Sequence, residues 1–153
     1  MKRLIGILVA GVTLVLAASA FASPQAASGC VEGLKKINGV NARTFCGPAK
    51  ATVRVNGRTI VYKNGNCSKS FVGFEVNIGT VVLGNVKLKP EYFGLIAKAK
   101  AGTHGDGSLA VNHAGKDVAI LKATITLKPG LKAGTFSGKV FGSTARITGS
   151  FTC

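Results

Sequence analysis

The feature that most constrains the fold of this chain is a pair of alternating segments joined by Asn56-Gly57. Residues 51–55 and 58–62 both alternate apolar with polar side chains, which is the two-residue period of a β-strand with one buried face. Asn-Gly supplies the two positive-φ positions that a type I′ turn requires, and such a turn joins two strands tightly. The sequence therefore predicts an antiparallel β-hairpin over residues 51–62.

A two-residue turn also determines which residues of the hairpin lie opposite each other. It predicts three opposing pairs on one face: Val55 with Arg58, Val53 with Ile60 and Ala51 with Tyr62. This face is apolar except for Arg58 beside the turn, whereas the other face is mostly polar. The hairpin is therefore expected to place one face on a core and the other in water.

The chain beyond this hairpin repeats the pattern of short alternating segments separated by turn residues. We expect strands over residues 72–78, 81–89, 92–101, 109–113, 118–127, 135–141 and 146–153, with a loop over 102–107. Within residues 118–127, the set expected to face the core is wholly apolar and comprises Ala119, Leu121, Ala123, Ile125 and Leu127. Eight or nine strands without a long helix predict an all-β fold, namely an antiparallel β-sandwich or half-barrel.

The N-terminus has the features of a secretory signal peptide. Lys2 and Arg3 precede an uncharged apolar run over residues 4–18, and small residues around Ala20 and Ala22 follow it. The run is shorter than the roughly 20 residues that a membrane-spanning helix needs. We predict cleavage of residues 1–22, a flexible or irregular segment over 23–45 with at most one helical turn, and a single β domain over 46–153. An uncleaved anchor and a lipid on Cys30 remain alternatives.

Export would place the four cysteines in an oxidising compartment, where disulfides form. Cys30, Cys46, Cys67 and Cys153 allow three pairings, and the sequence does not choose among them. Pairing of Cys30 with Cys46 would close the N-terminal segment, and pairing of Cys67 with Cys153 would join an early strand to the last one. A Cys-x-x-Cys motif is absent from the sequence, so a redox or zinc role has little support.

The sequence offers few candidate residues for a catalytic set. The two histidines, His104 and His113, have Asp106 and Asp117 nearby in sequence, and an enzyme would need these side chains to converge. The sequence contains no Gly-x-Ser-x-Gly, no Gly-x-Gly-x-x-Gly and no phosphate-binding loop, and its carboxylates are scattered. We therefore expect a noncatalytic protein with no cofactor and no metal.

The chain is strongly basic, with 20 lysine and arginine residues against 5 acidic ones. Loss of Lys2 and Arg3 with the signal peptide would leave 18 basic residues and a net charge of +13. Such an excess attracts anionic polymers and lipids, although lysines also promote solubility and block edge-to-edge aggregation of sheets. The candidate polyanion-binding residues pair up on expected strand faces and are Lys87, Lys89, Lys98 and Lys100. With 7% aromatic residues and no tryptophan, specific nucleic-acid binding is not expected.

Four short stretches have counterparts in a known family. They are Asn64-Gly65-Asn66-Cys67, residues 74–79 (FEVNIG), residues 134–138 (GTFSG) and residues 149–153 (GSFTC). With them, residues 57–153 resemble the small actinobacterial secreted and envelope antigens of the mycobacterial LpqH lipoprotein type. The resemblance implies an all-β domain at the cell surface and a disulfide between Cys67 and Cys153. The chain departs from that family at the lipidation motif, because Cys30 lies too far beyond the apolar run.

These observations predict a monomeric, noncatalytic protein that is secreted or held at the cell surface. One alternative is a binding module for anionic envelope polymers or lipids that uses the four lysines. Another alternative is a carrier of a small apolar ligand inside a cavity of the sheet. Contact with a membrane is expected only if Cys30 is lipidated.

Overall fold

The computed structural model describes residues 29–84 and 87–153, and the predicted signal peptide and its cleavage site lie outside the described residues. The regular secondary structure of the described chain is antiparallel β-sheet apart from one 3-10 turn at Pro129–Leu131. The strands are β1 (Gly33–Ile37), β2 (Val40–Phe45), β3 (Ala49–Val55), β4 (Arg58–Ser70), β5 (Gly73–Val82), β6 (Tyr92–Ala97), β7 (Gly102–His113), β8 (Lys116–Leu127), β9 (Ala133–Lys139) and β10 (Arg146–Thr152). No helix among these residues has the length and apolarity to cross a bilayer.

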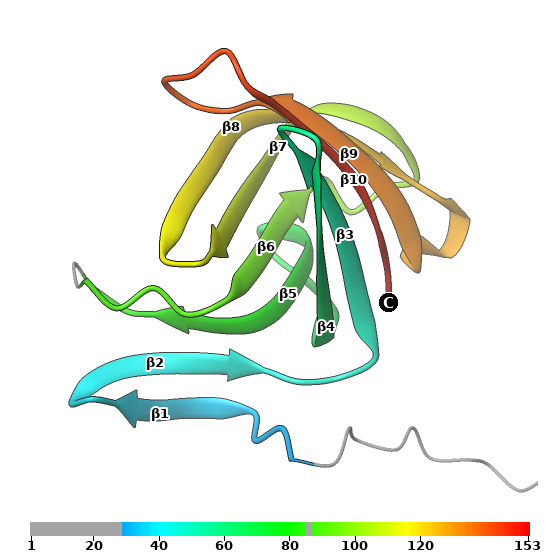
Figure 1. Cartoon of the computed structure of the whole chain (residues 1–153). Coiled ribbons are helices and arrows are strands. Elements are labelled where there is room, and N and C mark those ends of the chain that lie inside the picture. Colours follow the sequence, from blue (N-terminus) through cyan, green and yellow to red (C-terminus); the bar gives the residue numbers. More distant parts are fainter. Residues whose placement is uncertain (1–28, 85–86) are drawn as a thin grey trace, which may run out of the picture.

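Strands β3 to β10 form a closed barrel, whose strands wrap around a common interior in Figure 1. Each strand pairs with the next one along the chain, and β10 pairs with β3 to complete the ring, from Ile147 opposite Val55 to Thr152 opposite Lys50. The predicted all-β antiparallel fold is therefore confirmed. The sheet closes on itself and has ten strands in the described chain, two of them outside the ring.

The hairpin of β3 and β4 has the predicted turn and the predicted register. Asn56 and Gly57 have φ values of 48° and 73°, the positive values that a type I′ turn requires. Val55 lies opposite Arg58, Val53 opposite Ile60 and Ala51 opposite Tyr62. Val53, Ala51 and Tyr62 are buried, so this face of the hairpin lies on the core as expected.

The core-facing set expected on β8 is only partly correct, because the strand contains a β-bulge. Gly107 of β7 lies opposite Ala123 and Leu109 lies opposite Ile120, so β8 has one residue more than β7 over this stretch. The extra residue reverses the alternation. Ala123, Ile125 and Leu127 point into the core as expected, whereas Ala119 and Leu121 are exposed and Ile120 is buried instead.

The N-terminal segment expected to be irregular contains a hairpin, and no helical turn forms over residues 31–45. Strands β1 and β2 make this hairpin, and β2 pairs with the end of β5, from Phe45 opposite Gly79 to Ala42 opposite Val82. The hairpin therefore extends the barrel sheet and lies outside the ring (Figure 1). A Thr44–Thr80 hydroxyl hydrogen bond of 2.9 Å and the packing of Phe45 on Tyr92 attach it.

Three further strand expectations need correction. The expected loop over residues 102–107 is the first half of β7, which stays paired with β8 through a bulge at residues 105–106. Strand β5 continues through Gly79 to Val82, because Gly79 takes a φ of 91° that keeps the strand going through a bend. Described residues 87–89 do not form a strand.

Two disulfides are present, Cys30–Cys46 and Cys67–Cys153. The second is the pairing that the family resemblance implied. It joins β4 to the residue that follows β10, across a sequence separation of 86 residues. Both bridges indicate an oxidising, extracytoplasmic environment.

The barrel interior is filled by aromatic rings and by the glycines that make room for them. Phe93 packs between Tyr62 and Phe136, with ring centroids 5.8 and 5.4 Å away. On β9 and β10, Phe136 lies opposite Gly149 and Phe151 lies opposite Gly134. A Cβ atom on Gly149 would lie 2.3 Å from the Phe136 ring, so only glycine fits there.

Candidate binding site at the open end of the barrel

A pocket of about 670 Å³ opens at one end of the barrel, between the β3–β4 hairpin and the β7–β8 hairpin. Its walls come from the ends of β3, β4, β7, β8 and β10. The lining residues are Val55, Asn56, Arg58, Thr59, Ile60, Val111, His113, Lys116, Val118 and Ile147. The pocket is therefore an unfilled end of the barrel interior.

The strand registers explain why these side chains line the interior. Ile60 lies two residues before the buried Tyr62 on β4, and Val111 lies opposite Val118 between β7 and β8. The alternation of side chains along a strand then points these residues and Ile147 to the inside. Five aliphatic side chains form the wall: Val55, Ile60, Val111, Val118 and Ile147. The aromatic cluster around Tyr62 and Phe93 fills the barrel beyond them.

Two cationic side chains stand at the rim of this apolar pocket. Arg58 lies opposite Val55 beside the β3–β4 turn, and Lys116 lies opposite His113 beside the β7–β8 turn. Within residues 29–84 and 87–153, neither Arg58 nor Lys116 takes part in an ion pair. Their positive charges are therefore available to a ligand in the pocket.

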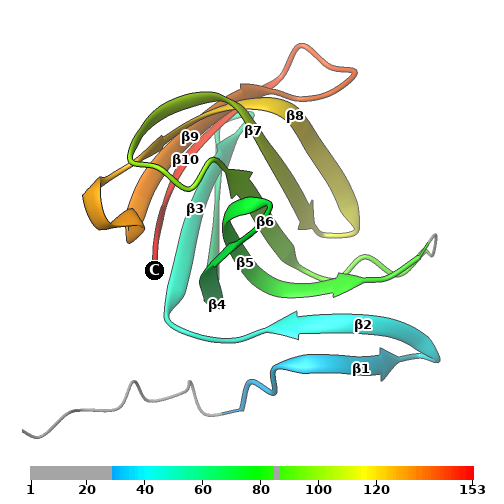
Figure 2. The same ribbon diagram turned by 180° about the vertical axis from the view of Figure 1, so that it is seen from behind.

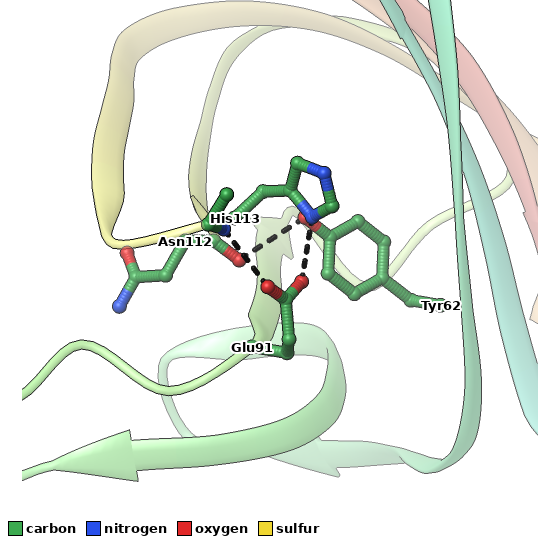
Figure 3. Close-up of polar contacts among 5 residues, drawn as sticks. Tyr62, Glu91, Asn112 and His113 are labelled. Carbon is green, nitrogen blue, oxygen red and sulfur yellow. Dashed lines mark hydrogen bonds and ion pairs between the residues drawn. The ribbon is translucent and has the colours of Figure 1, made fainter.

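The carboxylates at this end of the barrel hold the β5–β6 connection against the β7–β8 hairpin. Glu91 accepts hydrogen bonds from His113 Nδ1 at 2.7 Å and from the Ala114 backbone N at 2.9 Å (Figure 3). Lys89 makes an ion pair with Asp117 on the same hairpin. These contacts fix one side of the pocket rim, and they leave both carboxylates already engaged.

The pKa of Glu91 reports the same contacts. Desolvation acts to raise the pKa of this carboxyl, but the hydrogen bond from Ala114 and the hydrogen bond and charge of His113 outweigh it, so the pKa lies below its ordinary value. Glu91 is therefore ionised at neutral pH and is a poor proton donor.

Tyr62 lies beside this group and is held in its neutral form. Its hydroxyl donates to the Asn112 carbonyl oxygen at 3.1 Å (Figure 3). Burial, and then the negative charge of Glu91, raise the pKa of Tyr62 well above its ordinary value. The hydroxyl therefore stays protonated and serves as a hydrogen-bond donor that joins β4 to β7.

The four residues of the sequence-based enzyme alternative lie at two ends of the barrel. His104 and His113 are nine residues apart on β7, which places them about 30 Å apart along the strand. His104 Nε2 contacts the Lys100 carbonyl oxygen at 2.6 Å, whereas His113 contacts Glu91 and Asp117 pairs with Lys89. No group of three or more metal-ligating side chains occurs among the described residues.

The four candidate lysines also divide into two separate places. Lys87 and Lys89 lie in the β5–β6 connection at the pocket end, where Lys89 is already paired with Asp117. Lys98 and Lys100 lie in the β6–β7 connection at the opposite end. The pairs therefore do not form one surface, and none of the four lies within a strand.

The carrier alternative required a cavity in the sheet, but the sequence did not predict where this cavity lies or which residues line it, although Arg58 gave a signal for its place. Arg58 is the one charged residue on the apolar face of the β3–β4 hairpin. It lies beside the turn, and the turn lies at the open end of the barrel. Lys116 carries no comparable signal, because it lies in an expected turn. Comparison with protein-family models, curated proteins and solved structures finds no match to this chain.

Proposed function

We propose that this is a noncatalytic, exported binding protein that carries a small, mainly apolar ligand with one anionic group. The observation that carries the proposal is the pocket at the open end of the barrel, with an aliphatic wall and two cations at its rim. Its export or display at the cell surface rests on the predicted signal peptide and agrees with the two disulfides.

The size and lining of the pocket suit a small molecule. Its volume of about 670 Å³ falls in the middle of the range of about 300–1,000 Å³ that small-molecule sites occupy. Each Å² of apolar ligand surface that leaves water contributes about 25 cal/mol to binding. A hydrocarbon chain or a small ring system against Val55, Val111 and Ile147 would gain this term along its whole length.

The rim selects the head group of the ligand. Arg58 and Lys116 stand on different hairpins, so an anion between them would meet positive charge from both sides. A carboxylate suits Arg58 in particular, because a guanidinium donates two parallel hydrogen bonds to it. A neutral ligand of the same length would lose these charge-assisted bonds and keep only the apolar term.

Displacement of a fluorescent polyene fatty acid, such as parinaric acid, tests this proposal. Decanoate is expected to displace the probe more effectively than decanol, because only the carboxylate engages Arg58 and Lys116. Arg58→Gln is expected to weaken decanoate about tenfold, the value of one charge-assisted hydrogen bond, and to leave decanol nearly unchanged.

Arg54→Gln is the matched control, because Arg54 lies on the outer face of the same hairpin and is exposed. This variant should bind decanoate like the parent protein. Val118→Trp, which places an indole in the pocket, should abolish binding of probe and competitors alike. Absence of probe binding, or equal loss in Arg54→Gln and Arg58→Gln, would contradict the proposed carrier function.

A further inference from the structure

The β4–β5 hairpin exposes an aromatic ring at the end of the barrel opposite to the pocket. Phe71 is fully exposed, at 102% of its reference area, and Val72 beside it is 53% exposed. The turn is held in shape, because the Val72 backbone N donates to Ser70 Oγ at 3.2 Å and Ser70 donates to Glu75. The ring is therefore presented to solvent by an ordered turn.

Three exposed lysines lie on the segments next to this apolar tip. Lys69 precedes it on β4 and is exposed, and Lys98 and Lys100 come from the neighbouring β6–β7 connection. The two connections adjoin, since a Cβ atom on Gly73 would lie 2.3 Å from the Ala97 carbonyl oxygen and 3.9 Å from the Lys98 backbone N. We call Phe71, Val72, Lys69, Lys98 and Lys100 the hairpin-tip patch.

Lysines outnumber carboxylates at the same end of the barrel. The β8–β9 connection adds Lys128 and Lys132, on the side of the barrel where the β6–β7 connection also lies (Figure 2). Glu91 and Asp117 belong to the opposite end. Of the three other acidic residues, Glu75 accepts a hydrogen bond from Ser70, Asp106 lies within β7, and Glu32 accepts a hydrogen bond from Asn66 of β4.

We propose that the hairpin-tip patch docks on the surface of an anionic lipid bilayer, with Phe71 and Val72 entering the interface and the lysines facing the head groups. Phe71 and Val72 would gain free energy by leaving water against an apolar partner, which a hydrophilic polyanion does not offer. Two side chains bury far less than the roughly 800 Å² per partner of a stable protein interface. The interface of a lipid bilayer is fluid, so it accepts a single protruding aromatic side chain with lysines around it.

The chemistry sets the size of the expected effects. A lysine near an anionic surface strengthens binding about fivefold, and the phenylalanine side chain adds about tenfold or more when it leaves water. Phe71→Ser should therefore reduce the partition coefficient onto anionic vesicles at least about tenfold. Lys98→Gln with Lys100→Gln should reduce it about fivefold for each charge removed. Neither change alters a residue of the pocket. A loss of vesicle binding in these variants therefore tests docking alone and leaves the carrier function unaffected.

The absence of tryptophan from the chain makes a local reporter available. The variant Phe71→Trp places the sole indole at the hairpin-tip patch, and Phe141→Trp places it in the β9–β10 connection at the pocket end, where Phe141 is 73% exposed. Each variant is exported, checked by intact mass and mixed with phosphatidylcholine vesicles with or without about one third phosphatidylglycerol. Because the reporter is local, the comparison is independent of the N-terminal apolar run.

The expected result is a blue shift of Phe71→Trp emission with anionic vesicles only, and quenching by lipids brominated on their acyl chains. The shift should shrink from about 0.1 M to about 1 M salt, as screening of the lysines increases. Lys35→Gln with Lys36→Gln, on the exposed β1 strand, should retain binding better than the Lys98 and Lys100 pair. A shift at Phe141→Trp alone, or binding to heparin with no shift at Phe71→Trp, overturns the proposal.

Discussion

At the scale of single residues, Gly134 and Gly149 of β9 and β10 make room for aromatic rings and are not turn residues. Gly149 carries no unusual φ, but its missing Cβ leaves room for Phe136 and for the Thr52 carbonyl oxygen, 2.3 and 2.1 Å from where a Cβ would lie. Gly149→Ala should therefore lower the free energy of unfolding by about 1–3 kcal/mol, the typical cost of overpacking. Gly105→Ala is the control, because nothing lies within 4 Å of that position. Urea denaturation of both variants tests this, and equal stabilities would contradict it.

The Glu91 carboxyl gives a pH dependence at the same scale. Its pKa is lowered in the folded protein from an ordinary 4.5, so its contribution to stability is present above about pH 4.5 and is lost as the pH falls through the lowered value. Glu91→Gln should make the free energy of unfolding less dependent on pH in that acidic window. The difference should stay under about 1 kcal/mol, since the pair with His113 is open to solvent.

Asp106→Asn is the matched control for this pH dependence, because Asp106 accepts no hydrogen bond from the described residues. Chemical denaturation at a series of acidic pH values measures the effect. The interpretation fails if Asp106→Asn flattens the acid limb as much as Glu91→Gln does.

At the scale of elements, the bulge in β8 decides which side chains carry stability. Ile120 is 1% exposed and Leu121 is 63% exposed, the reverse of a regular alternation with Leu121 inside. Ile120→Ala should cost about 2–5 kcal/mol, whereas Leu121→Ala should stay within about 0.5 kcal/mol. Thermal or urea unfolding of the two variants separates the bulged register from a regular one, in which the larger loss would fall on Leu121.

The same scale shows why one hairpin was predictable to the residue and the bulge was not. The Asn56-Gly57 turn fixes how β3 and β4 pair, since a two-residue loop with positive φ values admits one register. Residues 118–121 of β8 are all apolar, so the sequence does not show which of them face the core. The inside–outside alternation of the β8 side chains is reversed only by the packing of β8 against β7.

The short pattern shared by residues 134–138 and 149–153 shows what else packing adds. Each stretch has a phenylalanine two residues after a glycine. Because β9 and β10 run antiparallel, the two copies place each ring over the glycine of the other strand. The resemblance of the two stretches was visible in sequence, but its complementarity depends on their pairing.

At the scale of the whole molecule, the two disulfides constrain the unfolded chain to different extents. Cys67–Cys153 spans 86 residues and Cys30–Cys46 spans 16. In the chain-entropy model, replacing the first pair by serine should cost about 4–5 kcal/mol and replacing the second about 3 kcal/mol. Denaturant unfolding of the two double variants tests this order, and a larger loss from the Cys30 and Cys46 pair would contradict it.

Ring closure and the place of the pocket were the parts of the molecule that the sequence did not reveal. Local patterns encode strands and turns, whereas closure depends on the accumulated twist of the strands and on the meeting of β3 with β10. The pocket follows from closure, since its wall joins residues from five strands that are far apart in sequence. Arg58 alone hinted at it, as a charge out of place on an apolar face.

The pairing of β10 with β3 has a consequence for how the chain reaches its fold. Every other pairing in the ring joins consecutive strands, so each hairpin forms by closing a short loop. Only this seam brings together segments about a hundred residues apart, and a search over that distance is slow compared with hairpin formation. Until this seam closes, β3 and β10 are unpaired edges of an open sheet and are complementary to each other. A second molecule at the same stage offers the same edges, so crowding would favour exchange of strands between chains at this one seam.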